Sequence, residues 1–222
     1  MRGRDGGTVS GRVDLRVLEL LCSKLCHDLI SPVGAINNGV ELVREFDGNM
    51  DGDVLDLIDA SARLASRRLD FFRLAFGAGG SAGDRIGAGQ AHDVAAGIFA
   101  DSKATLIWPD AAETGQDWAK EPARLLLNCI LLALEALPRG GTVRVDTPPG
   151  EGRLSARITA DGTRAELKPE VRQALTEDID PAALAAHNVH AYFARRLGRR
   201  IGAALRIGDD TAESVTFTLT VP

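Results

Sequence analysis

The stretch LELLCSKLCHDLISPVGAINNGVELVREF, residues 18–46, determines how the rest of the chain is organised. Apolar or small residues recur at a spacing close to a heptad, which predicts one long amphipathic helix with an apolar seam: Leu15, Leu18, Cys22, Leu25, Leu29, Ile36, Val40 and Val43. With Cys22 at an a position, His27 falls at f, so its imidazole is predicted to face solvent. Pro32 lacks the N–H that would bond the Asp28 carbonyl, and it is expected to bend or loosen the helix there.

A second helix is expected after the turn-rich segment DGNMDG at residues 47–52. Its apolar positions alternate three and four residues apart: Leu55, Ile58, Ala62, Ala65, Leu69, Phe72 and Phe76. The two helices are predicted to form an antiparallel hairpin, residues 13–78, whose apolar face is widened by Leu21, Ile30, Val33, Leu57 and Leu64. A lone hairpin cannot bury this face, so we expect a homodimer with a four-helix bundle. The alternative is a monomer in which the second domain covers the hairpin.

Composition excludes several classes of protein. A chain of 222 residues with 45% hydrophobic and 26% charged residues is typical of a globular protein of one or two domains. Its net charge of −5 argues against non-specific nucleic-acid binding. Residues 1–12 are rich in Gly and Arg, which predicts disorder and no secretory signal, and the apolar run at 125–137 is too short to span a bilayer. An odd number of cysteines fits reduced thiols, and we expect a cytoplasmic protein.

Two groups of potential metal ligands carry little weight. Cys22, Cys26 and His27 have no distant partner pair, so buried thiols are favoured over a metal centre. His187 and His190 could share a metal at i, i+3, but no carboxylate or cysteine lies near them in the sequence. Packing is the favoured role for both, and for His92. The sequence therefore predicts no metal site.

A glycine-rich segment at residues 77–83, with Gly87 and Gly89 close behind, predicts a flexible linker to a second domain at 84–222. Helices are expected at 90–100, 117–137, 168–175 and 181–197, the last with Gly198 as its stop. Strands are expected at 104–108, 142–146, 153–160, 203–207 and 214–221. These elements predict an α+β sandwich with a mostly antiparallel sheet and helices on one face.

Two stretches are similar to the core of bacterial sensor histidine kinases. The sequence HDLISPV at residues 27–33 resembles their H-box, and residues 126–145, LLNCILLALEALPRGGTVRV, resemble the N-box helix and following strand of their ATP-binding domain. The resemblance covers about residues 13–222. It implies a fold with a dimeric hairpin of the kinase dimerisation and phosphotransfer (DHp) type, followed by a Bergerat (GHKL) domain.

The departures from that pattern fall on the nucleotide site. Asn128 matches the first N-box asparagine, but Leu132 stands where a second asparagine would help hold Mg-ATP. The expected Asp-x-Gly-x-Gly loop survives only as DGTRA at residues 161–165. The glycine-rich phosphate loop is absent, and the acidic segment DIDPAAL, residues 178–184, takes its place. We therefore expect a degenerate domain that does not bind ATP.

A kinase-like core that keeps the histidine but loses the ATP site resembles the ChpT family of histidine phosphotransferases. The matching segments are CHDLISPVGAINNGVEL at residues 26–42, Ser61-Ala62-Arg63, and residues 75–78. The resemblance implies a homodimer that relays phosphoryl groups from the receiver domain of a CckA-like hybrid kinase to CtrA-like and CpdR-like response regulators. It implies no cofactor of its own, with Mg²⁺ on the partner receiver. The alternatives are an ATP-dependent kinase with a divergent nucleotide site and a non-enzymatic dimeric adaptor.

His27 is the predicted nucleophile, because neutral imidazole can attack the acyl phosphate of a receiver aspartate near pH 7. Asp28 is expected to orient the imidazole or accept its proton; the alternative is a solvated carboxylate, because adjacent helical residues face each other poorly. Lys24 and Ser31 share the histidine's face and could touch a phosphoryl oxygen or be surface decoration.

The same face is predicted to continue as the receiver-docking surface. Small residues at Gly34, and also at Gly39, would let a receiver helix approach closely; the alternative is a relaxed turn after Pro32. Asn38 and Glu41 continue this face on the first helix. Arg63 and Arg67 on the second helix could meet acidic receiver residues; the alternative is that they are exposed arginines without a specific role.

Overall fold

The computed structural model describes residues 14–45, 52–77, 85–109, 111, 115–149, 153–208, 211 and 213–222. The predicted disordered N-terminus, nearly all of the predicted inter-helix turn and most of the predicted linker lie outside these residues. The helices are α1 (Leu15–Glu45), α2 (Gly52–Ala75), α3 (Ala88–Phe99), α4 (Lys120–Glu135), α5 (Pro169–Thr176), the 3₁₀ turn η1 (Pro181–Ala183) and α6 (Val189–Arg200). The strands are β1 (Arg85–Gly87), β2 (Ala104–Ile107), β3 (Asp117–Ala119), β4 (Gly141–Asp146), β5 (Ser155–Asp161), β6 (Ala204–Ile207) and β7 (Ser214–Thr220).

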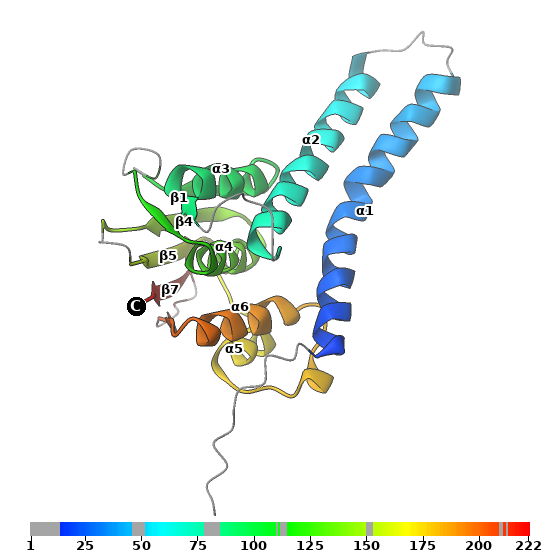
Figure 1. The fold of residues 1–222 in the computed structure, drawn as a ribbon. Helices are drawn as coiled ribbons and strands as arrows, with labels where there is room; N and C mark the ends of the chain where they lie inside the picture. Colours follow the sequence, from blue (N-terminus) through cyan, green and yellow to red (C-terminus); the bar gives the residue numbers. More distant parts are fainter. Residues whose placement is uncertain are drawn as a thin grey trace, which may run out of the picture.

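Helices α1 and α2 form the predicted antiparallel hairpin, and one end of it projects away from the rest of the molecule (Figure 1). Pro32 does not break α1, which is helical throughout Leu15–Glu45, although its axis changes direction along its length (Figure 1). Gly39 is buried at the hairpin contact, where an added Cβ would lie 2.5 Å from Ile58 Cγ1. Gly39 therefore lets α1 and α2 approach each other, and the expectation that it serves a receiver helix is wrong.

The predicted apolar seam has two sides. Positions such as Leu25, Leu29, Ile36 and Ile58 are partly buried inside the protomer. A second set remains exposed: Leu15, Leu18, Cys22, Cys26, Ile30 and Val33 on α1, with Leu55, Ala62 and Leu69 on α2. We call this second set the outer apolar face. It includes both cysteines, so the expectation that Cys22 and Cys26 are buried thiols is wrong for the protomer, and only Cys129 is buried.

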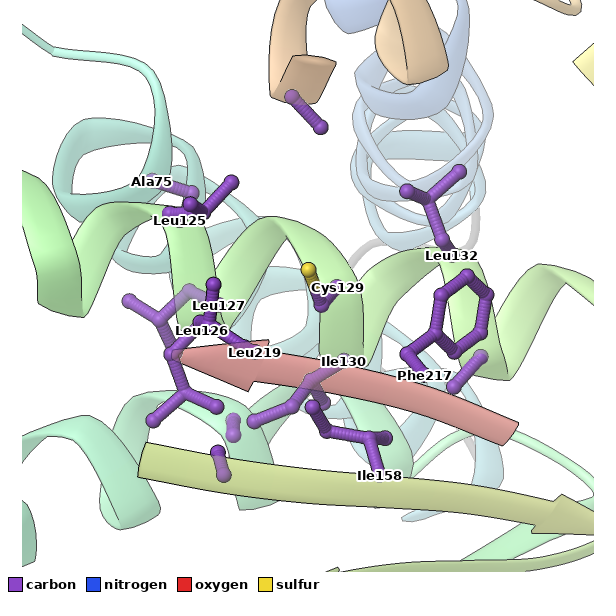
Figure 2. Close-up of a cluster of buried hydrophobic side chains, with 14 of the residues drawn as sticks. Ala75, Leu125, Leu126, Leu127, Cys129, Ile130, Leu132, Ile158, Phe217 and Leu219 are labelled. Carbon is purple, nitrogen blue, oxygen red and sulfur yellow. The ribbon is translucent and has the colours of Figure 1, made fainter. Parts of the chain in front are cut away.

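A five-stranded sheet, ordered β2-β4-β5-β7-β6, forms the second domain. Only β2 and β4 run parallel, which confirms the mostly antiparallel prediction. Burial alternates along β5 and β7, as expected for a sheet with one covered face. Helix α4, apolar on most sides, packs on this face against Ile158, Phe217 and Leu219 (Figure 2). The predicted combination of a helical hairpin and an α+β domain is confirmed.

Two predicted helices are shorter than expected. Residues 117–119 form β3, which pairs with β1, because the Arg85 guanidinium binds the Asp117 carboxylate at 2.6 Å and Trp118 is buried. This pairing also places Gly87, assigned to the linker, in a strand. Residues 181–188 are not one α-helix: the Asp180 carboxylate accepts from the Ala182 N–H at 2.9 Å and caps only a 3₁₀ turn.

The C-terminal end of α6 differs from the prediction as well. The helix passes Gly198 and ends at Arg200, and Gly202 takes the left-handed conformation with φ +68°. The Ala203 N–H donates to the Gly198 carbonyl at 2.9 Å, and the Gly202 N–H donates to the Arg199 carbonyl at 3.3 Å. This pair of bonds is a Schellman motif, so Gly202 terminates the helix and Gly198 does not.

The hairpin and the second domain share one core. Val17, Leu20, Phe71 and Phe72 belong to the same buried cluster as the interior of the sheet domain. In addition, the Arg124 guanidinium on α4 donates to the Phe76 carbonyl at 2.9 Å, just beyond the end of α2. Carbonyls at a helix C-terminus lack intrahelical partners, so a cationic donor there stabilises the junction. None of the described helices combines the length and apolar character needed to cross a membrane.

Candidate functional site

His27 lies near the middle of α1, and 85% of its side chain is exposed. Its Nδ1 lies 3.4 Å from Asp28 Oδ1. An ionised carboxylate only accepts hydrogen bonds, so this contact favours the tautomer with the proton on Nδ1, in which the Nε2 lone pair is directed elsewhere. No hydrogen bond to Nε2 is formed by any residue in the described part of the chain. The geometry suits a nucleophile that acts through Nε2 on a partner molecule.

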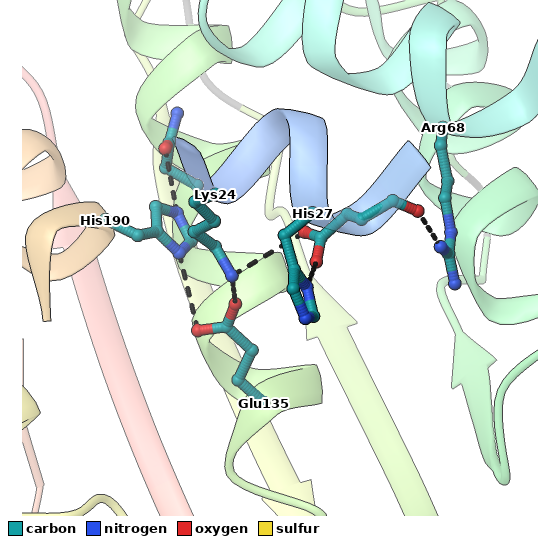
Figure 3. Close-up of polar contacts among 7 residues, drawn as sticks. Lys24, His27, Arg68, Glu135 and His190 are labelled. Carbon is teal, nitrogen blue, oxygen red and sulfur yellow. Dashed lines mark hydrogen bonds and ion pairs between the residues drawn. The ribbon is translucent and has the colours of Figure 1, made fainter. Parts of the chain in front are cut away.

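The backbone beside His27 is held by the second helix. Pro32 has no N–H, so the Asp28 carbonyl has no partner one turn later in α1. Arg68 of α2 donates from Nη1 to this carbonyl (Figure 3). The proline predicted to weaken the helix is therefore matched by a cationic donor from α2, which keeps the His27 turn helical.

Lys24 connects this turn to the second domain. Its Nζ lies 2.9 Å from Glu135 Oε1, at the end of α4, and 3.7 Å from Asp28 Oδ2 (Figure 3). Burial lowers the pKa of Lys24, but the charge and hydrogen bond of Glu135, followed by those of Asp28, outweigh it, so the pKa lies above its ordinary value. The ammonium is thus held between two carboxylates instead of projecting toward a partner.

Glu135 is itself part of a longer polar chain. Its Oε2 lies 3.5 Å from Nδ1 of His190, which is 1% exposed, and His190 Nε2 lies 2.9 Å from Asn128 Oδ1 (Figure 3). Burial raises the pKa of Glu135, but the hydrogen bond and charge of His190, followed by those of Lys24, lower it to about 2. The chain Asp28–Lys24–Glu135–His190–Asn128, which we call the polar chain, therefore runs from the His27 turn into the interior of the second domain.

Asn128, the residue that matches the first N-box asparagine, is fully buried. Its Nδ2 donates to the carbonyls of Ala75 at 3.0 Å and Arg124 at 2.7 Å, so its Oδ1 must accept from His190 Nε2. Leu132, at the second N-box position, is 1% exposed. The helix that carries ligands for Mg-ATP in the kinase pattern here directs its polar group into contacts within the chain.

The remaining positions of the kinase nucleotide pattern also make internal contacts. Asp161 accepts a hydrogen bond from Ser214 Oγ at 2.7 Å. Gly162 lies so close to Gly140 that an added Cβ would stand 2.5 Å from the Gly140 carbonyl oxygen. In the acidic segment at 178–184, Asp178 pairs with two arginines of α6, Arg195 at 2.7 Å and Arg199 at 2.6 Å. Asp178 therefore pairs with the two arginines of α6 that lie beside this segment.

The docking residues predicted from the sequence have different surroundings. Ser31, Asn38 and Glu41 are exposed on the same side of α1 as His27, and an added Cβ at Gly34 would meet nothing within 4 Å. Arg63 is exposed and pairs with Asp59 on its own helix, at 2.7 Å. Arg67 instead turns toward the second domain and pairs with Asp101, at 3.1 Å. Lys24 and Arg67 are thus already engaged within the protomer.

Sequence reasoning missed three residues of this site: Arg68, Glu135 and His190. Because Pro32 has no N–H, the sequence indicates that the Asp28 carbonyl needs another hydrogen-bond donor, but it does not indicate which helix provides that donor. Glu135 lies within the stretch that resembles the N-box, but nothing local indicates that it pairs with Lys24, and His190 belongs to no motif. The sequence favoured a packing role for His190, and this residue is indeed buried. His190 also connects Asn128 with Glu135 in the polar chain.

Comparisons with known proteins show which proteins this chain is similar to. The family described as the histidine phosphotransferase C-terminal domain matches residues 88–213. The chain is 39% identical over 199 residues to the protein phosphotransferase ChpT of Brucella abortus (strain 2308), covering 90% of this chain and 92% of that protein. A solved structure titled as a bacterial phosphotransferase superposes with a TM-score of 0.77 at 35% identity, covering 94% of this chain and 97% of that chain. The chain therefore belongs to the histidine phosphotransferase family.

Proposed function

We propose that this phosphotransferase carries the phosphoryl group on His27 Nε2, between the receiver domain of a hybrid kinase and the receiver domain of a response regulator. The observation that carries the proposal is the 85% exposed imidazole with Nδ1 on Asp28 and Nε2 open. Acyl phosphate and phosphohistidine are both high-energy species, so transfer needs mainly alignment and charge stabilisation. The receiver supplies Mg²⁺, and this chain supplies the nucleophile and the surface that aligns it.

The proposal excludes ATP as the phosphoryl donor. The amide of Asn128 is committed to internal hydrogen bonds, Leu132 offers no oxygen to a hard cation, and Asp178 pairs with Arg195 and Arg199. Opening such a site for a nucleotide would break the hydrogen bonds of the buried Asn128 amide, which costs free energy at each group left unsatisfied. Labelled ATP should therefore leave the pure protein unlabelled, whereas an autokinase would acquire label on His27.

The outer apolar face favours a homodimer that forms a four-helix bundle. Every large apolar side chain that is exposed among the described residues lies on α1 or α2. Leu55, Ala62 and Leu69 repeat every seven residues on α2, as expected of a helix–helix seam. Replacing Leu69 by Glu should give monomers in light scattering, whereas Glu at Leu42, which is exposed outside that face, should leave dimers. A dimeric Leu69→Glu variant would argue against this interface.

The docking surface that we propose follows α1 from His27 through Ser31, Gly34, Asn38 and Glu41, with Arg63 on α2. By the family resemblance its partners are a CckA-like hybrid kinase and CtrA-like and CpdR-like response regulators in the cytoplasm. Profiling phosphotransfer to all response regulators of the host would identify the true recipients. A recipient set without close homologues of these regulators would overturn this choice of partners.

The experiment that tests the function is transfer of labelled phosphate from a phosphorylated receiver. Wild-type protein should acquire acid-labile label and pass it to a second receiver, and His27→Ala should do neither while remaining folded. Transfer to the second receiver by the His27→Ala protein would show that His27 is not the carrier. Binding of receivers by wild-type protein without any transfer would favour the adaptor alternative.

A further inference from the structure

The polar chain gives Lys24 an unusual position. Its ammonium lies 3.7 Å from Asp28 Oδ2, while the other oxygen of that carboxylate, Oδ1, is the one near His27 Nδ1. Glu135, which comes from the other domain, holds the same ammonium at 2.9 Å. Adjacent residues on a helix do not face each other, so Asp28 can meet the His27 ring only in a restricted orientation of its carboxylate. A cation at the far oxygen supplies that restriction.

We propose that Lys24 and Glu135 are positioning residues for phosphoryl transfer: Glu135 fixes Lys24, and Lys24 fixes the Asp28 carboxylate against Nδ1 of His27. The inference rests on the proposed function, because it assigns these residues to the His27 reaction. The proposal also gives the degenerate domain a part in that reaction. Glu135 is the last residue of the N-box helix, and it is contacted from the interior of the domain by His190, which in turn contacts Asn128.

This arrangement assists the transfer of the phosphoryl group from the receiver aspartate to His27. The Nε2 lone pair forms the N–P bond while the P–O bond to the receiver aspartate breaks, and the aspartate carboxylate takes the electron pair. The imidazole then carries a positive charge with its proton on Nδ1, which the Asp28 carboxylate stabilises or accepts. Passing the proton on to water leaves neutral phosphoimidazole. A carboxylate already in place at Nδ1 lowers the reorganisation needed in this step.

Lys24 and Glu135 both stay charged over the pH range of an assay, so the pair between them persists. The pKa of Lys24 is above its ordinary value, and that of Glu135 is about 2. Both groups therefore remain ionised near neutral pH. The simpler explanation is that the Lys24–Glu135 pair only clamps the hairpin to the second domain, and a charge reversal separates the two roles.

In single-turnover transfer from a phosphorylated receiver, Lys24→Met and Glu135→Gln should each slow the maximal rate about tenfold, less than the roughly 100-fold at which direct acid–base catalysis begins. The half-saturating receiver concentration should change less than about twofold. The double variant Lys24→Glu with Glu135→Lys keeps a pair between the domains but places a carboxylate beside Asp28. We expect it to regain thermal stability and to stay slow. Recovery of the wild-type rate in the double variant would reduce the pair to a clamp and overturn the proposal.

A second measurement needs no partner. Nitrogen chemical shifts of ¹⁵N-labelled protein report which ring nitrogen of His27 carries the proton. Wild-type protein should show mainly the Nδ1–H form, and Lys24→Met and Glu135→Gln should shift the ring toward the Nε2–H form. Arg73→Met, which removes an exposed pair with Asp70, serves as the matched control and should change nothing. An unchanged tautomer in both variants would refute positioning, whatever the transfer assays show about His27 as the carrier.

Discussion

A histidine lies beside each end of the polar chain, His27 next to Asp28 and His190 next to Asn128, and the surroundings of these two histidines are opposite. His27 on α1 is 85% exposed and touches one carboxylate, whereas His190 on α6 is 1% exposed and lies between Asn128 and Glu135. The exposed ring keeps a free nitrogen for chemistry with a partner. The buried ring uses Nε2 for a hydrogen bond and directs Nδ1 at a carboxylate, so it can only support structure. Accessibility of a lone pair, more than residue type, separates the two roles.

The comparison extends to the helices that carry them. On α1, Ser31, Asn38 and Glu41 are exposed on the same side as His27. On α4 the corresponding motif residue, Asn128, bonds the end of α2 and His190 instead of a ligand. The residue that matches an ATP-site asparagine in the kinase pattern therefore makes internal hydrogen bonds in this chain.

The largest expected effect is on catalysis at the exposed end. His27→Ala should lower phosphotransfer by at least about a thousandfold, because it removes the nucleophile that we propose. Its free energy of unfolding should change by less than about 0.5 kcal/mol, because the side chain is exposed. Label transfer from a phosphorylated receiver and urea denaturation of the same sample test both statements. A large loss of stability would mean that His27 also has a structural role, and would contradict the difference in role between His27 and His190.

At the buried end of the polar chain, the main expected effect is on stability. Asn128→Ala should destabilise the protein by about 2–3 kcal/mol, because His190 Nε2 and the Ala75 carbonyl lose a buried partner. Urea denaturation measures this loss. Asn37→Ala, a matched change at an exposed site on α1, should alter stability by no more than about 0.5 kcal/mol. Equal effects at the two sites would contradict the structural role assigned to Asn128.

The stability that Glu135 contributes in the middle of the polar chain should decrease as the pH falls. The pKa of Glu135 falls from 4.5 to about 2 on folding, so its contribution to stability is complete above about pH 4.5 and disappears as the pH falls toward 2. At pH 7, Glu135→Gln should be less stable by about 1–2 kcal/mol, a value reduced because a third of the side chain remains in water. Denaturation of both proteins across this range should show the difference shrinking below pH 4.5. A difference that grows on acidification would assign the effect to another group.

The smallest effects concern two glycines of α1. Gly34→Ala should stabilise the hairpin by about 0.5–1 kcal/mol, because Ala is the better helix former and the added Cβ meets nothing within 4 Å. Gly39→Ala should cost about 1 kcal/mol, because its Cβ would stand 2.5 Å from Ile58. Thermal denaturation compares the pair. If a receiver helix approaches Gly34, the Gly34→Ala protein should also need a higher receiver concentration for half-maximal transfer.

Much of the architecture followed from local patterns. Heptad spacing predicted the hairpin and the outward direction of His27, and the five strands of the main sheet were predicted near their observed positions. The missing N–H of Pro32 predicted an unpaired Asp28 carbonyl. These features depend on residues close together in sequence, where helical and strand geometry alone decide which side chains share a face.

What the sequence could not supply were the partners across long separations. Lys24 meets Glu135, Arg67 meets Asp101 and Arg68 meets the Asp28 carbonyl only because the second domain and α2 pack where they do. Periodicity also missed the strand at residues 117–119, whose partner β1 lies far back in the chain. The sequence by itself determined that a histidine would be exposed on a two-helix hairpin beside a kinase-like domain. The tertiary structure decided which charges surround it, because ion pairs between distant segments depend on packing that no local pattern encodes.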